Sequence, residues 1–151
     1  MTPVDRMRPS SVLFVCGLNA VRSPMAEALA RLWFSKTIYI QSAGVRKGEL
    51  DPFSVKAMEE LGVDISRHRP RTIEEIEDDN FDLIITLAPE AHHKALDMTR
   101  TIAAEVEYWP APDPQLANGS RDQIMEVYRQ VRDGLARRIK ARLEWKPTGG
   151  H

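Results

Sequence analysis

The sequence predicts an α/β fold of three layers, with helices on both faces of a four-stranded, mostly parallel sheet. Runs of strand type alternate with runs of helical type, and this order implies parallel pairing with right-handed crossovers. The first and third strand runs are almost wholly apolar, as expected of strands that are covered on both faces. The predicted strands span residues 11–15, 37–42, 82–87 and 105–109.

Signals for helix starts and stops lie between these strands. Ser23 is a predicted N-cap, with Pro24 at the first helical position. Asp51-Pro52 repeats that pattern, and Gly62 is suited to end the helix that they open. Two shorter helices are expected, one opened by a capping box and one by a proline, at 72–75 and 89–98.

The last segment has the clearest helical pattern, which opens with the capping-box pair Ser120 and Gln123. Apolar residues then recur at helical spacing: Ile124, Val127, Tyr128, Val131, Leu135, Ile139 and Leu143. The other face carries Arg129, Arg132, Arg137, Arg138, Lys140 and Arg142. A basic face could bind an acidic partner, but we interpret this one as a solvated helix face.

Composition restricts the class of protein. The chain has 151 residues, which fits one domain over 1–151, with residues 1–10 expected to form a loose tail. A formal net charge of -1 gives no general attraction to nucleic acid or to an anionic membrane. A single cysteine excludes an internal disulfide framework and a Cys-rich zinc site. The N-terminus lacks a signal-peptide core, and no apolar run approaches the ~18 residues of a membrane span, so a cytoplasmic location is expected.

The sole cysteine, Cys16, ends the first predicted strand, and the loop "CGLNAVR" follows it. In a parallel sheet, ligands sit beyond the carboxyl ends of the strands. Backbone N–H groups between a strand and a helix N-terminus can converge on an anion, and Arg22 adds a guanidinium fork that fits two oxygens of a tetrahedral oxyanion. Gly17 and Asn19 tolerate positive φ most easily. The pattern predicts a thiolate, with the Ser23 hydroxyl as its hydrogen-bond donor, aimed at phosphorus.

Displacing an alkoxide or phenoxide from a phosphoester requires a general acid. Two Asp-Pro pairs compete for this role. Asp51 is expected to be occupied as a helix N-cap, whereas Asp113 follows the last strand on the edge from which the Cys16 loop emerges. Pro112 and Pro114 restrict the backbone on both sides of Asp113. We therefore predict Asp113 as the acid and keep Asp51 as the second candidate.

The chain resembles the low-molecular-weight protein tyrosine phosphatase family. The resemblance covers residues 11–145 and is carried by "VLFVCGLNAVRSPMAEAL", "SAGV", "DPFSVKAMEELGVDISRHRPR", "FDLIITL" and "PDP". It implies a flavodoxin-like sheet, a cysteinyl-phosphate intermediate and neither metal nor cofactor. It also implies that Cys16 is the nucleophile, that Arg22 binds the phosphoryl group and that Asp113 acts as acid and then base. The implied phosphate loop comprises Gly17, Leu18, Asn19, Ala20, Val21, Arg22 and Ser23, supported by Asn19, Ser23, Ser42 and His68.

The sequence departs from the family pattern in the loop and at the rim. Leu18 stands where glycine is usual, and Val21 stands where many members carry a second cysteine. The stretches that often carry rim aromatics read "VRKGEL" and "QLANGS" here. Arg46 and Lys47 in the first stretch could favour an acidic substrate, although solvated charges are the simpler interpretation.

Three functions remain open from the sequence. The first is a phosphomonoester hydrolase acting on a phosphorylated protein, with phosphotyrosine as the expected residue, or on a small phosphoester. The second is an arsenate reductase coupled to an external thiol. An internal cysteine relay is not expected, because it needs further thiols and the chain has only Cys16. The third is a non-catalytic phosphate-binding regulatory module. His92-His93 is not expected to bind metal, because adjacent helical residues point apart, and the oligomeric state is not predicted.

Overall fold

Four parallel strands form one sheet in the order β2-β1-β3-β4. The computed structural model describes residues 9–76, 80–100 and 102–144. The strands are β1 (Ser11–Cys16), β2 (Tyr39–Gly44), β3 (Leu83–Thr86) and β4 (Glu105–Tyr108). The fully buried strands β1 and β3 occupy the centre of the sheet, as their apolar sequences predict.

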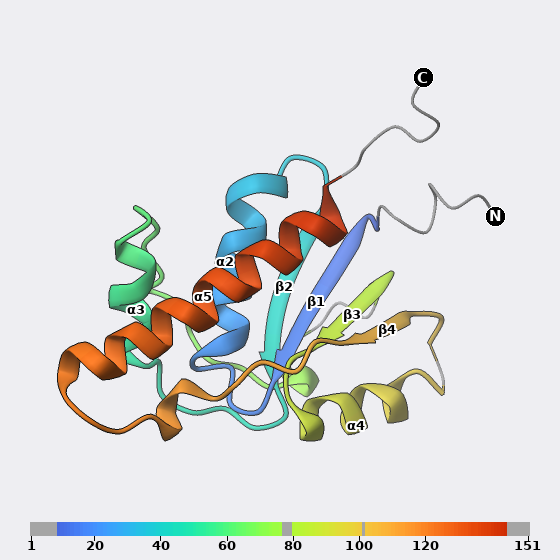
Figure 1. Ribbon diagram of the computed structural model, residues 1–151. Coiled ribbons are helices and arrows are strands. Elements are labelled where there is room, and N and C mark those ends of the chain that lie inside the picture. Colours follow the sequence, from blue (N-terminus) through green and yellow to red (C-terminus); the bar gives the residue numbers. More distant parts are fainter. Residues whose placement is uncertain (1–8, 77–79, 101, 145–151) are drawn as a thin grey trace.

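Helices cover both faces of this sheet. Figure 1 shows α2 and α5 crossing one face, with α3 at their side, and α4 below the other face. The α-helices are α2 (Arg22–Phe34), α3 (Pro52–Glu59), α4 (Pro89–Met98) and α5 (Arg121–Leu143), and the 3₁₀ helices are η1 (Ile73–Glu75) and η2 (Pro114–Leu116). The three-layer α/β architecture is confirmed.

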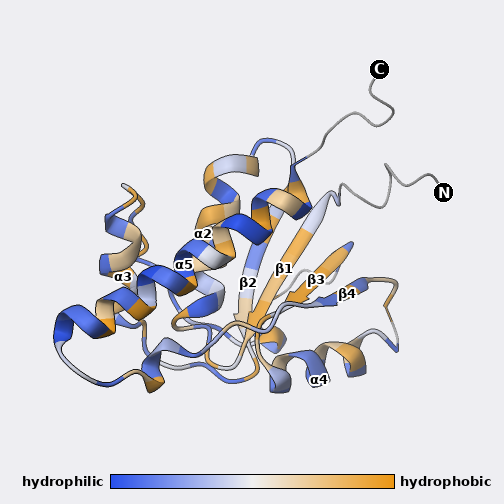
Figure 2. Ribbon diagram, viewed as in Figure 1, coloured by the Kyte–Doolittle hydropathy of each residue, from blue (hydrophilic) through white to orange (hydrophobic). Residues whose placement is uncertain are grey.

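Alternate residues of β1 supply two separate hydrophobic clusters. Val12 and Phe14 pack with apolar residues of α2 and α5, whereas Leu13 and Val15 pack with Ala91 and other small residues of α4. The period of two along a strand directs these side chains to opposite faces. Figure 2 shows the corresponding pattern, with apolar central strands and hydrophilic stretches on the outer surface of α5.

Several predicted helix boundaries are confirmed. Asp51 is the N-cap of α3, where its side chain accepts a hydrogen bond from the Phe53 backbone N–H. Gly62, just beyond that helix, has φ of 75°. Capping boxes open η1 and α5, at Thr72 and Ser120. The local signals for these starts and stops were therefore sufficient.

Two boundary predictions were wrong. The second strand begins at Tyr39, because the backbone N–H groups of Thr37 and Ile38 still bond to the Phe34 carbonyl at the end of α2. The helix α2 begins at Arg22 with Val21 as its N-cap, so Ser23 is not the cap. The Ser23 hydroxyl instead contacts the Cys16 sulfur, which a sequence rule for helix caps cannot anticipate.

The basic face of α5 is only partly solvated. Arg132 is 7% exposed, and its guanidinium contacts the Ala57 carbonyl, Glu60 and Asp133. The prediction of a wholly solvated face was wrong at this position, because α3 packs against α5 there.

At the start of the described chain, the Ser10 backbone N–H donates to Asp82 at 2.7 Å. Residues 1–8 of the predicted tail lie outside the described residues. Within the described residues, no helix is both long and apolar enough to cross a membrane.

Candidate active site

The loop after β1 turns its carbonyl groups away from the space that it encloses. The carbonyls of Cys16, Gly17 and Leu18 accept from the backbone N–H groups of Val45, Arg46 and Gly48, at 2.9–3.1 Å. The Ala20 carbonyl similarly accepts from the N–H of Asp51. No hydrogen bond among the described residues uses the backbone N–H groups of residues 17–21. These donors therefore remain available to an anion in the loop.

Two backbone features allow this loop conformation. Asn19 has φ of 52°, whereas Gly17 does not have positive φ, so only one of the two predicted positions uses the left-handed region. Gly44, at the end of β2, lies so close to the loop that an added Cβ would be 2.7 Å from the Asn19 backbone nitrogen. The loop thus requires a residue without a side chain on the neighbouring strand.

The Asn19 side chain holds the loop from inside. Its amide nitrogen donates to the hydroxyl oxygens of Ser23 and Ser42, at 2.8 and 3.0 Å. Its carbonyl oxygen accepts from the Arg71 backbone N–H and contacts His68 Nε2, each at 3.0 Å. This fully buried amide uses two donor and two acceptor positions, which is its usual full capacity. All four supporting residues predicted from the sequence therefore meet in one network.

The Cys16 sulfur lies 2.9 Å from the Ser23 hydroxyl oxygen, as predicted. Cys16 is 2% exposed and lines a cavity of about 110 Å³. This volume corresponds to roughly four liquid water molecules, which suits a small tetrahedral oxyanion. The cavity is lined by Cys16, Gly17, Leu18, Ala20, Val21, Arg22, Arg46, Glu90, Asp113 and Gln115.

Arg22 links the loop to the ends of two other strands. Its Nη1 donates to the Ala111 carbonyl at 3.0 Å and lies 3.5 Å from the Leu87 carbonyl. Leu87 follows β3 directly, and Ala111 comes three residues after β4. These contacts hold the guanidinium at the cavity, where its remaining N–H groups can bind oxyanion oxygens.

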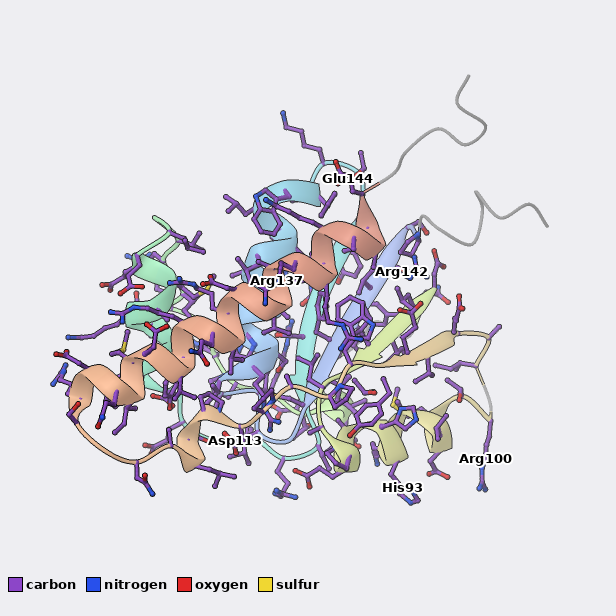
Figure 3. All side chains as sticks on the ribbon, in the orientation of Figure 1. His93, Arg100, Asp113, Arg137, Arg142 and Glu144 are labelled. Atoms are coloured by element: carbon purple, nitrogen blue, oxygen red, sulfur yellow. The ribbon has the colours of Figure 1, made fainter. Side chains whose placement is uncertain are left out.

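Asp113 lies on the same cavity, and Asp51 does not. A cap role does not separate the two aspartates, because Asp113 is itself the N-cap of η2 and accepts from the Gln115 N–H at 3.0 Å. The difference lies in the second carboxylate oxygen. In Asp51 this oxygen accepts from the buried Tyr128 hydroxyl, whereas that of Asp113 has no hydrogen-bond partner among the described residues. Figure 3 shows Asp113 on the segment between β4 and α5, near the carboxyl ends of the strands.

Glu90 also lines the cavity and was not predicted from the sequence. Glu90 lies in the first turn of α4, and its carboxylate accepts from the Arg46 guanidinium at 2.7 and 3.2 Å. Its side chain also covers Gly17. The available signal was its place three residues after the third apolar strand, at the same sheet edge as Cys16. Arg46 thus lines the cavity in an ion pair rather than as an isolated solvated charge.

Burial lowers the pKa of His68 from its ordinary value of 6.5, and Arg71 and Arg31 act in the same direction against Glu27. His68 is therefore neutral at pH 7, with its Nε2 proton available for Asn19. The pKa of His68 is lower in the folded protein than in the unfolded one. Its neutral ring therefore contributes its full stabilisation above the unfolded pKa, and this contribution is lost as pH falls through the folded pKa.

We expect the free energy of unfolding to fall as pH decreases below about 6.5. Replacing His68 by glutamine, which keeps an amide donor, should weaken this dependence. Urea denaturation at several pH values between about 8 and 5 measures it. Equal pH dependence in both proteins would show that His68 is not its source.

Within the described residues, no group of three or more His, Cys, Asp or Glu side chains could hold a metal ion. His92 instead contacts the Thr86 hydroxyl through Nδ1 at 3.0 Å and stacks on Tyr108.

Comparison with known proteins agrees with this arrangement. A model of the low molecular weight phosphotyrosine protein phosphatase family matches residues 11–145. An arsenate reductase of Bacillus subtilis is 34% identical over 143 residues, covering 95% of this chain and 99% of the relative. Another relative, the glutaredoxin arsenate reductase of Synechocystis, is 31% identical and covers 85% of this chain and 92% of its own.

Solved structures of both phosphatases and arsenate reductases are similar to this chain. A low molecular weight protein tyrosine phosphatase from T. tengcongensis matches with a TM-score of 0.73 at 26% identity, over 86% of this chain and 95% of its own. An arsenate reductase in its phosphate-binding state matches with a TM-score of 0.68 at 31% identity, over 87% and 95%. By sequence and by fold, the chain belongs to the low molecular weight phosphotyrosine protein phosphatase family, whose cysteine-dependent enzymes include phosphatases and arsenate reductases.

Proposed function

We propose that this protein is a phosphomonoester hydrolase that works through a cysteinyl-phosphate intermediate, with phosphotyrosine or a small phosphoester as substrate. The observation that carries the proposal is the meeting of Cys16, Arg22 and Asp113 on one cavity of about 110 Å³. A hydrolytic cycle needs one thiol, and the chain has one cysteine. A free nucleophilic thiol must also stay reduced, which supports a cytoplasmic location.

In the first step, the Cys16 thiolate attacks phosphorus, so that an S–P bond forms and the ester P–O bond breaks. Loop N–H groups and the Arg22 guanidinium bind the three equatorial oxygens as charge shifts among them. Asp113 donates its proton to the leaving oxygen. In the second step, water attacks phosphorus, Asp113 accepts a water proton, and the S–P bond breaks. The Ser23 hydroxyl, 2.9 Å from the sulfur, stabilises the departing thiolate.

The second candidate is an arsenate reductase that uses an external thiol. It is favoured by the curated relatives that carry that name, including the glutaredoxin arsenate reductase. Arsenate copies the shape and charge of phosphate and would be bound by the same loop. Because Cys16 is the only cysteine, the two electrons that reduce arsenate to arsenite would come from external thiols. A purely regulatory phosphate-binding module is disfavoured, since it needs neither Cys16 nor Asp113.

Side-by-side rates separate these functions. We expect hydrolysis of p-nitrophenyl phosphate and of phosphotyrosine peptides to exceed arsenate reduction measured with glutathione, and with glutaredoxin as coupling protein. The Cys16→Ser variant is the control for each assay. Arsenate reduction that is much faster than hydrolysis would establish the reductase instead, and the absence of both activities would favour the regulatory module.

A further inference from the structure

A second, strongly basic cavity lies behind the catalytic loop, outside the site described above. It has a volume of about 600 Å³ and is formed by the end of α2, β2 and the segment 67–71. Five of its lining residues are cationic: Arg31, Lys47, Arg67, Arg69 and Arg71. This cavity shares no lining residue with the Cys16 cavity.

Internal ion pairs neutralise only two of these cations. Glu27 pairs with Arg31 at 3.0 Å, and Glu75 pairs with Lys47 at 3.2 Å. These are the two carboxylates among the lining residues of this cavity, and Arg67, Arg69 and Arg71 form no ion pair with them.

The three remaining arginines are placed differently. Arg71 is half-buried and oriented by the Ser42 carbonyl and by Gln41. Arg67 and Arg69 are exposed, and neither forms a hydrogen bond or ion pair with another described residue. One ordered guanidinium beside two that form no hydrogen bond or ion pair with the described residues is suited to several phosphate oxygens, because each fork fits two of them.

An apolar cavity of about 450 Å³ continues from this basic one. The two share the lining residues Glu27, Arg31, Arg67 and His68. The rest of its wall includes the apolar side chains of Leu32, Val63 and Ile65, with Leu32 52% exposed. The carboxylate of Asp64 also lines this wall and attracts Arg67. A ligand with phosphates at one end and an apolar ring at the other would match both halves.

We propose that this double cavity is a second anion site, which binds a polyphosphate chain through Arg67, Arg69 and Arg71. A nucleoside triphosphate is the form that would also fill the apolar half. A single hydrogen bond connects this site to the catalytic loop, because His68 lines both halves and contacts the Asn19 side chain. This proposal does not depend on the reaction catalysed at Cys16.

The test is a binding titration with ATP and with inorganic tripolyphosphate. An Arg22→Ala variant of the full chain removes the guanidinium that binds anions at the catalytic loop. Calorimetry on this variant then measures binding at the second site. We expect one bound ATP per chain. Adding Arg67→Ala and Arg69→Ala should weaken binding about a hundredfold, since two charge-assisted contacts are lost.

The matched control is Lys36→Ala with Arg137→Ala, which removes two exposed positive charges elsewhere, Arg137 being on α5 (Figure 3). This control should bind as the Arg22→Ala protein does. ATP binding tighter than tripolyphosphate binding supports the nucleotide form, and equal affinities support recognition of the polyphosphate chain alone. No binding in the Arg22→Ala protein, or equal loss in the control and the Arg67/Arg69 variant, would overturn the proposal.

Discussion

Replacing Cys16 by serine is expected to lower the hydrolysis of aryl phosphates by about 10⁴-fold or more, because the chain then has no thiolate to form the S–P bond. Binding of inorganic phosphate should persist in this variant. The groups that bind the anion are the loop N–H groups and Arg22, and the Asn19 network holds the loop in place. None of these needs the sulfur to bind phosphate. Steady-state rates with p-nitrophenyl phosphate and calorimetry with phosphate measure the two effects.

The single cysteine allows an independent check of the same mechanism. Alkylation by iodoacetate can modify only Cys16 among thiols, so mass spectrometry reports that position directly. Inorganic phosphate should slow this alkylation by occupying the loop. Acid quenching during turnover should trap one phosphoryl group on the wild-type chain and none on the serine variant. Substantial hydrolysis by Cys16→Ser would falsify the covalent route.

The second large effect concerns Asp113. We expect Asp113→Asn to slow hydrolysis of phenyl phosphate by about 10²- to 10³-fold, because phenoxide needs a proton as it leaves. The loss should be much smaller with p-nitrophenyl phosphate, whose leaving group is a weaker base. A series of aryl phosphates of graded leaving-group pKa therefore measures the role of Asp113 in the bond-breaking step.

Asp51→Asn is the matched control for this series. Asp51 is 7% exposed, caps α3 and accepts a hydrogen bond from Tyr128. Burial, together with this hydrogen bond, raises the pKa of Tyr128 well above its ordinary value. Its replacement should reduce stability by roughly 1–3 kcal/mol through a weakened buried hydrogen bond, without changing leaving-group dependence. Strong leaving-group dependence in Asp51→Asn, and not in Asp113→Asn, would mean that the two roles are reversed.

Local sequence patterns were reliable where short-range chemistry decides the outcome. The caps at Asp51 and Ser120 form as predicted, because each side chain bonds to a backbone N–H two or three residues away. The same logic failed at Ser23, whose hydroxyl bonds to Cys16 across the loop. Capping rules describe neighbours in sequence, and a competing partner seven positions earlier is outside their range.

The sequence by itself determined the fold class and the placement of Cys16 at the carboxyl end of a buried strand. It also proposed Asp113, but only the tertiary structure separates Asp113 from Asp51, because both cap a helix and Asp113 alone lines the Cys16 cavity. Apolar runs and strand-helix alternation are properties of short segments, and they survive folding unchanged. Only the tertiary structure decided which charges meet. The Arg46–Glu90 pair over the catalytic cavity joins positions 44 residues apart, and the basic cavity of Arg67, Arg69 and Arg71 forms where β2 passes this segment. Electrostatic contacts depend on distance in space, which sequence spacing does not record.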